Sequence, residues 1–427
     1  MQSPYAALEV AVPSAPRGVP SLPDDMSGGS VARQAVGVGL GFMAAGMTAA
    51  AGVAADRLSR GRRTAVALDS SVADTRFHMT PDVEMVVTTT DGVELHVEID
   101  EPRGERTDDE ADLGPRPTIV FSHGYCLSLL CWFFQRRALR DAGYRVVLWD
   151  QRGHGRSGMG DKESVSIDQL GDDLYRVIQE TVPEGPIILV GHSMGGMSTM
   201  SLGLEYEQFV RERVVGVAFV ATSPGDLSTV SYGLGRIGGG IVRRLTPLTS
   251  TALAARQNLV EAGIRQGRDL VDFLVDFGSF GSPVPMSVAK LTTDMIFGTR
   301  MEVIAALFPL FDEHDKRDAL ASFDGIEALV FSGTADRLTP VSHSEGIVRC
   351  LPGAEQVVVR DAGHVIMLEH PDLLNEHLLD LVARSRRSAA GVGSPPAASI
   401  TRTPKVPRVV SDVSSRRAVD RARGRDA

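Results

Sequence analysis

The sequence contains few cysteines and no motif with the spacing of a metal site. Cys126, Cys131 and Cys350 are the three cysteines among 427 residues, and none belongs to a CxxC pair or a Cys/His cluster. So few cysteines in so long a chain argue against a disulfide framework and are typical of a reducing compartment. The sequence therefore gives no reason to expect a metal or another cofactor.

Positive charge is scarce over most of the chain. The formal net charge is −10, but from residue 384 onward 11 Lys and Arg oppose three Asp, so the preceding residues carry about −18. Nucleic-acid binding relies on a basic surface, so the acidic body excludes nucleic acid as the main partner. Residues 385–427 are basic, rich in Ser, Pro and Ala and without hydrophobic periodicity. This composition predicts a disordered tail, with weak attraction to anionic lipid as an alternative.

The N-terminal region divides into two segments of different composition. Residues 1–30 are rich in Pro, Ser and Gly, which predicts disorder. Residues 31–63 predict an Ala/Gly-rich apolar helix, and its uncharged part, residues 34–55, is long enough to span a bilayer. Two interpretations stay open: a membrane anchor, or a small-residue helix lying on the catalytic domain. The arginines that follow would place an anchored domain on the inner face of the membrane, so the predicted location is cytoplasmic.

Apolar strands and helical segments alternate between residues 80 and 384. An Asp91-Gly92 turn signal joins two short β-runs, and later apolar runs are continuous, as in buried parallel strands. This alternation predicts an α/β fold, with a mostly parallel central sheet and helices on both faces. The predicted core comprises residues 80–224 and 326–384.

About a hundred residues, 225–325, separate two strands that should be neighbours. Loops of this length are uncommon unless they are functional. Apolar residues recur at helical spacing within the segment, for example at Leu270, Val271, Leu274 and Val275. The segment therefore predicts a helical cap inserted into the sheet domain.

A G-x-S-x-G motif, Gly191-His192-Ser193-Met194-Gly195, lies between an apolar strand and a predicted helix. This strand–turn–helix context is that of a nucleophile elbow, in which flanking glycines let the backbone pass closely. Ser193 would stand at a helix N-terminus, where the dipole favours developing negative charge. The motif predicts Ser193 as a nucleophile.

A nucleophilic serine needs a base and an acid that orients it, expected here in the chain order serine, acid, histidine. Asp336 and His364 each follow a predicted strand, so both should lie in loops at one edge of the sheet. They are the predicted acid and base. Asp361 is an alternative acid, whose other role would be loop hydrogen bonding.

The oxyanion formed during attack needs two preorganised donors. We predict the backbone N–H of Met194, directly after the nucleophile, and that of Tyr125, in the loop after strand 118–122. His123 is expected to support this loop by hydrogen bonding. The segment 150–157, which carries Arg152 and His154, is expected to form a structural turn stabilised by charge.

Together these segments resemble the α/β-hydrolase superfamily, in particular its capped esterases and lipases. The resemblance covers residues 80–384 and rests on His123-Gly124, Asp150-x-Arg152-Gly153-x-Gly155-x-Ser157, Gly191–Gly196, Gly333-x-x-Asp336 and Gly363-His364. It implies a serine hydrolase that cleaves carboxylic esters through an acyl-enzyme, without a metal or cofactor. Ser193 excludes the branches of this superfamily that use an aspartate nucleophile.

The resemblance leaves the substrate open, since one fold hosts many chemistries. A small, apolar acyl ester is the expected partner; a cofactor-free haloperoxidase-like perhydrolase, a thioesterase or acyltransferase, and a non-enzymatic ligand-binding protein are alternatives. Five phenylalanines of the predicted cap are candidates for an acyl pocket or for plain cap core: Phe273, Phe277, Phe280, Phe297 and Phe308. The sequence indicates neither the ester nor the oligomeric state.

Overall fold

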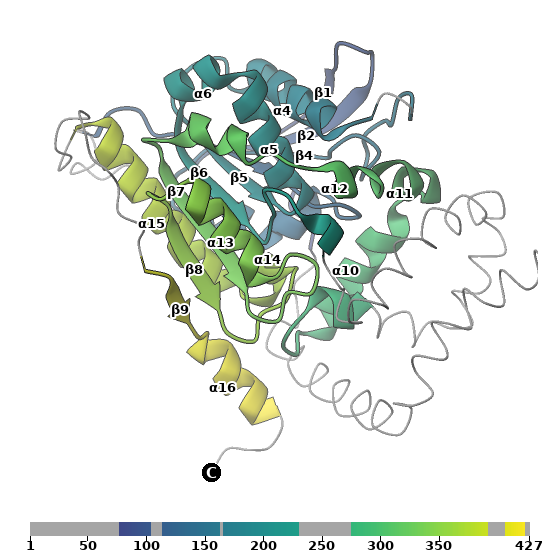
Figure 1. The fold of residues 1–427 in the computed structure, drawn as a ribbon, viewed down its shortest axis with the longest axis vertical. Coiled ribbons are helices and arrows are strands. Elements are labelled where there is room, and N and C mark those ends of the chain that lie inside the picture. The colour runs from purple at the N-terminus through teal and green to yellow at the C-terminus, as the bar shows by residue number, and fades with distance from the viewer. Residues whose placement is uncertain (1–76, 104–112, 163–164, 230–274, 392–405, 423–427) are drawn as a thin grey trace, which may run out of the picture. The chain divides into compact units, whose positions relative to one another are not determined.

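The computed structural model describes residues 77–103, 113–162, 165–229, 275–391 and 406–422 (Figure 1). All of them belong to one unit of the chain, residues 50–427. The predicted disordered segment 1–30 and the predicted helix 31–63, with its uncharged part 34–55, lie outside the described residues. Within the described ranges, no helix is both long and apolar enough to cross a bilayer.

One nine-stranded sheet, in the order β1-β2-β4-β3-β5-β6-β7-β8-β9, forms the centre of the described part. Strand β1 pairs antiparallel with β2 and β2 antiparallel with β4, and all other pairs are parallel. The strands are β1 Val83–Thr88, β2 Glu94–Asp100, β3 Thr118–Ser122, β4 Val146–Trp149, β5 Ile187–His192, β6 Val214–Val220, β7 Glu327–Gly333, β8 Glu355–Val359 and β9 Arg408–Val410. This sheet confirms the predicted α/β fold.

Helices cover both faces of the sheet, because alternate residues of each strand point to opposite sides. On β3, Ile119 and Phe121 pack in one core cluster with α3 (Phe133–Asp141) and α15 (Pro371–Ala389). Val120, between them, packs in a second cluster with three other helices. These are α4 (Ile167–Thr181), α5 (Met194–Glu205) and α13 (Val341–Cys350). Continuous apolar strands are thus buried on both sides, as the sequence predicted. Helix α6 (Glu207–Arg213) follows α5.

The long connection leaves the sheet after β6 and returns at β7, although these two strands are direct neighbours. Its described part contains the helical residues 275–279 and the helices α10 (Met286–Gly298), α11 (Met301–Leu307) and α12 (Leu310–Glu313), with 3-10 turns at Leu227–Thr229 and Asp318–Phe323. Leu270, Val271, Phe273 and Leu274 lie outside the described residues. Phe280 is buried in the sheet core, whereas Phe277 and Phe297 are 40% and 43% exposed. These three phenylalanines therefore do not share one environment.

The C-terminal region differs from the predicted disordered tail. Helix α15 continues to Ala389, β9 adds to the edge strand β8, and α16 (Val413–Ala422) follows it. We call residues 406–422 the C-terminal arm; it is the yellow end of the ribbon in Figure 1. The prediction of disorder from residue 385 is wrong for these described residues. A three-residue strand whose partner lies about fifty residues earlier leaves no periodic signal in the sequence.

Candidate active site

Ser193 occupies the turn between β5 and α5. Its φ of 50° lies in the left-handed region, which is strained for a residue with a side chain and is typical of functional turns. A Cβ on Gly191 would overlap the backbone of Gly195, and a Cβ on Gly195 would overlap the carbonyl of Ser122. The Ser193 N–H donates to Val220 O on the neighbouring strand, at 3.0 Å. The structure thus has the predicted strand–turn–helix, and both motif glycines are sterically required.

His364 and Asp336 form a buried pair in loops after β8 and β7. The Nδ1 atom of His364 lies 2.9 Å from Asp336 Oδ2. Thr339 donates to the same carboxylate through its backbone N–H, at 2.9 Å, and its hydroxyl, at 2.8 Å. Burial alone would raise the pKa of Asp336, but the His364 ring and these hydrogen bonds outweigh it and lower the pKa. The carboxylate is therefore ionised, and it accepts the Nδ1 proton of His364.

Asp361, the alternative acid, points away from this pair. Its exposed carboxylate lies 2.6 Å from Arg416 Nη2, and its N–H donates to Thr334 Oγ1 at 2.8 Å. The hydrogen bond with Thr334 is the loop hydrogen bond that the sequence predicted as the other role of Asp361. Of these two aspartates, it is Asp336 whose carboxylate contacts His364.

The His364 loop packs against the elbow through His192. The two imidazole rings are 4.8 Å apart between centroids, and His192 Nε2 lies 2.9 Å from His364 O. Burial lowers the pKa of His192 well below its usual range, so its ring is neutral and donates to this carbonyl. The residue directly before Ser193 thus holds the loop that carries the base, and Ser193 itself is half-buried beside them.

The loop after β3 passes over the elbow. A Cβ on Gly124 would come within 3.2 Å of Ser193 Cβ and would overlap the His192 ring, so only glycine fits there. The next residue is Tyr125, and Met194 is the first residue of α5, where a helix offers its N–H no internal acceptor. Neither amide hydrogen-bonds to another described residue. Both predicted oxyanion donors are therefore available.

Two histidines, one in this loop and one in the turn after β4, join the loop to that turn. Gln151 N donates to His123 Nε2 at 2.9 Å, so the neutral His123 ring carries its proton on Nδ1 and donates to Gly124 O at 2.7 Å. Cys126 N donates to His154 Nε2 at 3.1 Å. Burial lowers the pKa of His154 to about 3, so this ring remains a neutral acceptor. The supporting roles predicted for His123 and for the turn are confirmed.

The sequence also matches a known family over most of this core. A model described as the alpha/beta hydrolase family matches residues 119–377, which is more than half of the chain. The chain belongs to the alpha/beta hydrolase family. The match includes Ser193, Asp336 and His364.

The chain has several distant relatives. It is 26% identical over 267 residues to the dihydrolipoyllysine-residue acetyltransferase component of an acetoin cleaving system from Pseudomonas putida, covering 61% of this chain and only 62% of that relative's length. It is 25% identical over 288 residues to 3-oxoadipate enol-lactonase 1 from Acinetobacter baylyi, covering 67% of this chain and 92% of the lactonase. An esterase structure from Exiguobacterium antarcticum aligns with a TM-score of 0.53 at 18% identity, over 70% of this chain and all of the esterase. At that identity the likeness concerns the fold alone.

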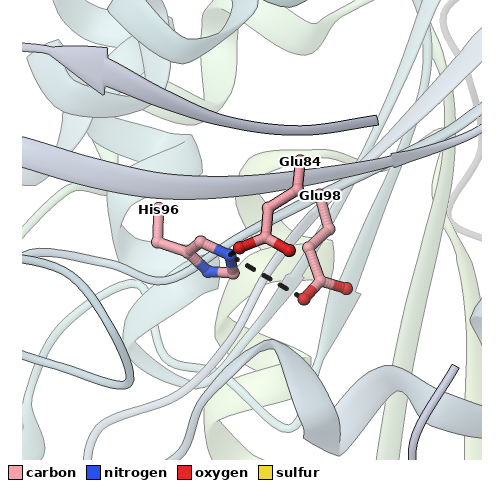
Figure 2. Close-up of side chains that lie close together, drawn as sticks. All are labelled: Glu84, His96 and Glu98. Carbon is pink, nitrogen blue, oxygen red and sulfur yellow. Dashed lines mark ion pairs between the residues drawn. The ribbon is translucent and has the colours of Figure 1, made fainter. Parts of the chain in front are cut away.

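A set of potential metal ligands lies on β1 and β2. Figure 2 shows Glu84, His96 and Glu98, whose ligand atoms all lie within 4.8 Å of one another. However, the Arg156 guanidinium already binds them: Nη1 donates to Glu84 at 2.8 Å and Nη2 to Glu98 at 2.7 Å. An arginine thus supplies the positive charge that these carboxylates need. The sequence analysis did not identify these three residues as a group. His96 and Glu98 are two residues apart on one strand, so they lie on the same face, and this spacing could have indicated them.

Two buried histidines contact Ser223, just before the inserted segment begins. His314 lies near the end of that segment and His343 follows it in the chain. His314 Nε2 lies 2.9 Å from Ser223 O, and His343 Nδ1 lies 2.7 Å from Ser223 Oγ. Burial lowers the pKa of His314 to about 4 and also lowers that of His343. Both rings are therefore neutral in the folded chain near pH 7.

We expect the protein to lose stability between about pH 6.5 and pH 4. The unfolded state binds protons on histidine below about pH 6.5, whereas the folded state keeps His314 neutral down to about pH 4. Lowering the pH from 7.5 to 5.5 should therefore cost about 1 kcal/mol of unfolding free energy through His314. Urea denaturation at both pH values measures this loss. It should be smaller in His314→Asn, whose amide can still donate to Ser223 O; an equal loss in both proteins would contradict the assignment.

Proposed function

We propose that the chain is a serine hydrolase that cleaves carboxylic esters through an acyl-enzyme at Ser193. The observation that carries this proposal is the buried Asp336–His364 pair beside a strained serine on a strand–turn–helix. A serine in this setting is activated by the base, and the base is oriented by the acid. The family, which includes esterases and lactonases among its matched relatives, agrees with acyl chemistry.

In the proposed reaction, Asp336 keeps the proton of His364 on Nδ1, which leaves Nε2 as the acceptor. Nε2 takes the hydroxyl proton of Ser193 while Oγ attacks the ester carbonyl. The amides of Met194 and Tyr125 stabilise the negative oxygen of the tetrahedral intermediate. His364 then gives its proton to the leaving alcohol, and a water molecule activated by the same Nε2 releases the acid. These steps use only side chains, two backbone amides and water.

The inserted helices are proposed to be a cap over this site. The hydroxyl of Tyr125 donates to Ile304 O of α11 at 2.8 Å, which connects the oxyanion loop to the insert. The Tyr125 ring also packs edge-on against Phe311 of α12, with 5.1 Å between ring centroids, and Phe311 contacts Phe308. This aromatic group supports an apolar acyl substrate. Phe308 was among the predicted lining residues, whereas Phe311 was missed.

The test is a series of p-nitrophenyl esters of increasing chain length, with monoacylglycerols, assayed on the wild type and on Ser193→Ala. Ser201→Ala, a serine of the same helix whose hydroxyl binds Asp168, is the matched control. Hydrolysis that is lost in Ser193→Ala and kept in Ser201→Ala supports the proposal, whereas hydrolysis that survives in Ser193→Ala overturns it. Peracid formation or acyl transfer to thiols faster than hydrolysis would assign the site to a perhydrolase or an acyltransferase instead.

A cytoplasmic location, with membrane association through residues 34–55, remains a proposal that rests on the sequence. Fractionation of cells that express the full chain, compared with cells that express a chain beginning at Asp69, tests it. Recovery of only the full chain with membranes supports the anchor. Recovery of both chains in the soluble fraction contradicts it.

A further inference from the structure

The C-terminal arm docks beside the loop that carries His364. Strand β9 pairs in parallel with β8, and Arg360 N donates to Val410 O at 2.9 Å where β8 ends. One residue further, Asp361 binds Arg416 of α16. The arm therefore contacts the chain directly before the base.

Asp412 is the buried anchor of this arm. Its Oδ1 accepts hydrogen bonds from Ser414 Oγ at 2.7 Å and Ser415 N at 2.9 Å, which caps α16. Its Oδ2 lies 3.1 Å from His370 Nδ1. The hydrogen bond with His370 is the main reason why the pKa of Asp412 lies well below its usual range. The carboxylate is thus ionised and can only accept, so His370 donates its Nδ1 proton to it.

The opposite edge of the His370 ring faces a second buried carboxylate, Glu369. Nε2 of His370 lies 3.7 Å from Glu369 Oε1. Burial raises the pKa of Glu369, while the neighbouring His370 ring and the donors around it oppose the rise. The His370 ring, which Asp412 orients, therefore opposes the effect of burial on Glu369.

Glu369 in turn ties the His364 loop to the insert. Its Oε2 accepts from Gly363 N at 2.7 Å, directly before His364, and its Oε1 accepts from Ser282 Oγ at 2.6 Å. A Cβ on Gly363 would overlap the backbone of Phe280 and Gly281, so the two segments pass in direct backbone contact. A continuous series of buried polar contacts thus leads from Asp412 to the residue before the base.

We propose that Asp412 is a positioning residue for His364 and acts through His370 and Glu369. The inference rests on the proposed role of His364 as the base. Without the charge of Asp412, the His370 ring loses its ionised acceptor and changes its orientation, its contact with Glu369 shifts, and the bond of Glu369 to Gly363 N is disturbed. A small displacement of a catalytic group can lower the rate by up to about 100-fold, so a loss of about tenfold in kcat is expected.

The test compares Asp412→Asn with Asp380→Asn, an exposed aspartate on α15 that undergoes the same change of charge. Asparagine still caps a helix, so α16 should remain folded. We expect kcat for ester hydrolysis to fall about tenfold in Asp412→Asn with KM within about twofold, and Asp380→Asn to match the wild type. A change in KM alone, or equal effects in both variants, would overturn the proposal.

Hydrogen exchange at single amides separates positioning from simple docking. The Arg360 amide reports the docking of the arm, whereas the Gly363 and Val365 amides, bonded to Glu369 and to Ser279 O, report the His364 loop. We expect all three to exchange faster in Asp412→Asn. Faster exchange at Arg360 alone, or at none of them, overturns the proposal. Hydrogen exchange can be measured without catalytic activity. If the wild type hydrolyses no ester, the proposed function is refuted, and the exchange rates still test the coupling between Asp412 and the His364 loop.

A variant with a smaller expected effect tests the same coupling if Asp412→Asn does not fold. Arg416→Gln removes the exposed pair with Asp361, and Arg417→Gln, the next residue of α16, is its matched control. Exchange at Gly363 should rise about two- to threefold in Arg416→Gln only, the size expected from an exposed ion pair. Equal exchange in both variants would contradict transmission from the arm.

Discussion

Replacing Asp336 with Asn is expected to lower kcat about 10³- to 10⁴-fold while KM changes little. An amide at this position can donate a hydrogen bond to His364 Nδ1, which would move the imidazole proton to Nε2. The ring would then present a donor instead of an acceptor to the Ser193 hydroxyl. Because Leu338 N and Thr339 N bond to one oxygen of the same side chain, the loop should keep its conformation. Steady-state hydrolysis of a p-nitrophenyl ester measures the loss.

Asp361→Asn is the matched control for this prediction. Its carboxylate is exposed and binds Arg416, and its φ of 61° is one that asparagine also adopts readily. Exposed ion pairs contribute at most about 1 kcal/mol, so kcat should remain within about fivefold of the wild type. A large loss in Asp361→Asn together with a small loss in Asp336→Asn would assign the acid to Asp361.

Arg152→Gln is expected to lower the free energy of unfolding by about 3–5 kcal/mol, the effect typical of breaking a buried ion pair. The Arg152 side chain is fully buried, and its Nε and Nη2 atoms each lie 2.7 Å from an oxygen of Asp173. Asp173 is also fully buried, and burial raises its pKa. Without the guanidinium, this carboxylate would be left buried without a counter-charge. Urea denaturation at pH 7.5 measures the change.

Arg156→Gln, in the same turn, provides the comparison. Its side chain is 55% exposed, and its buried partner Glu98 is also bound by Arg136. The loss should therefore stay near 1 kcal/mol. Equal losses in the two variants would show that burial of Arg152 does not decide the stability of this turn.

The parts of the site that depend on local sequence could be predicted. Gly191 and Gly195 flank Ser193 within one turn, and their steric roles follow from an apolar strand that leads directly into a helix. Asp336 and His364 could be named because parallel strands end at one edge of the sheet. The choice between Asp336 and Asp361 needed the structure, since both precede His364 and only geometry shows which carboxylate reaches its ring.

Contacts between distant segments could not be predicted from the sequence. The pairing of β9 with β8 and the series Asp412–His370–Glu369 join residues that no periodic pattern relates. Composition was misleading here, because a Ser- and Arg-rich tail has the signature of disorder even where one strand and one helix dock. Helical spacing likewise could not show that Phe280 belongs to the sheet core while Phe277 is exposed.

The proposed reaction depends on Ser193 as the nucleophile and on His364 as the base that activates it. The most direct measurement is labelling with a fluorophosphonate probe, followed by mass mapping of the modified peptide. We expect one adduct, on Ser193, that is absent in Ser193→Ala and forms far more slowly in His364→Ala. An unlabelled wild type, or an adduct on another residue, would contradict it.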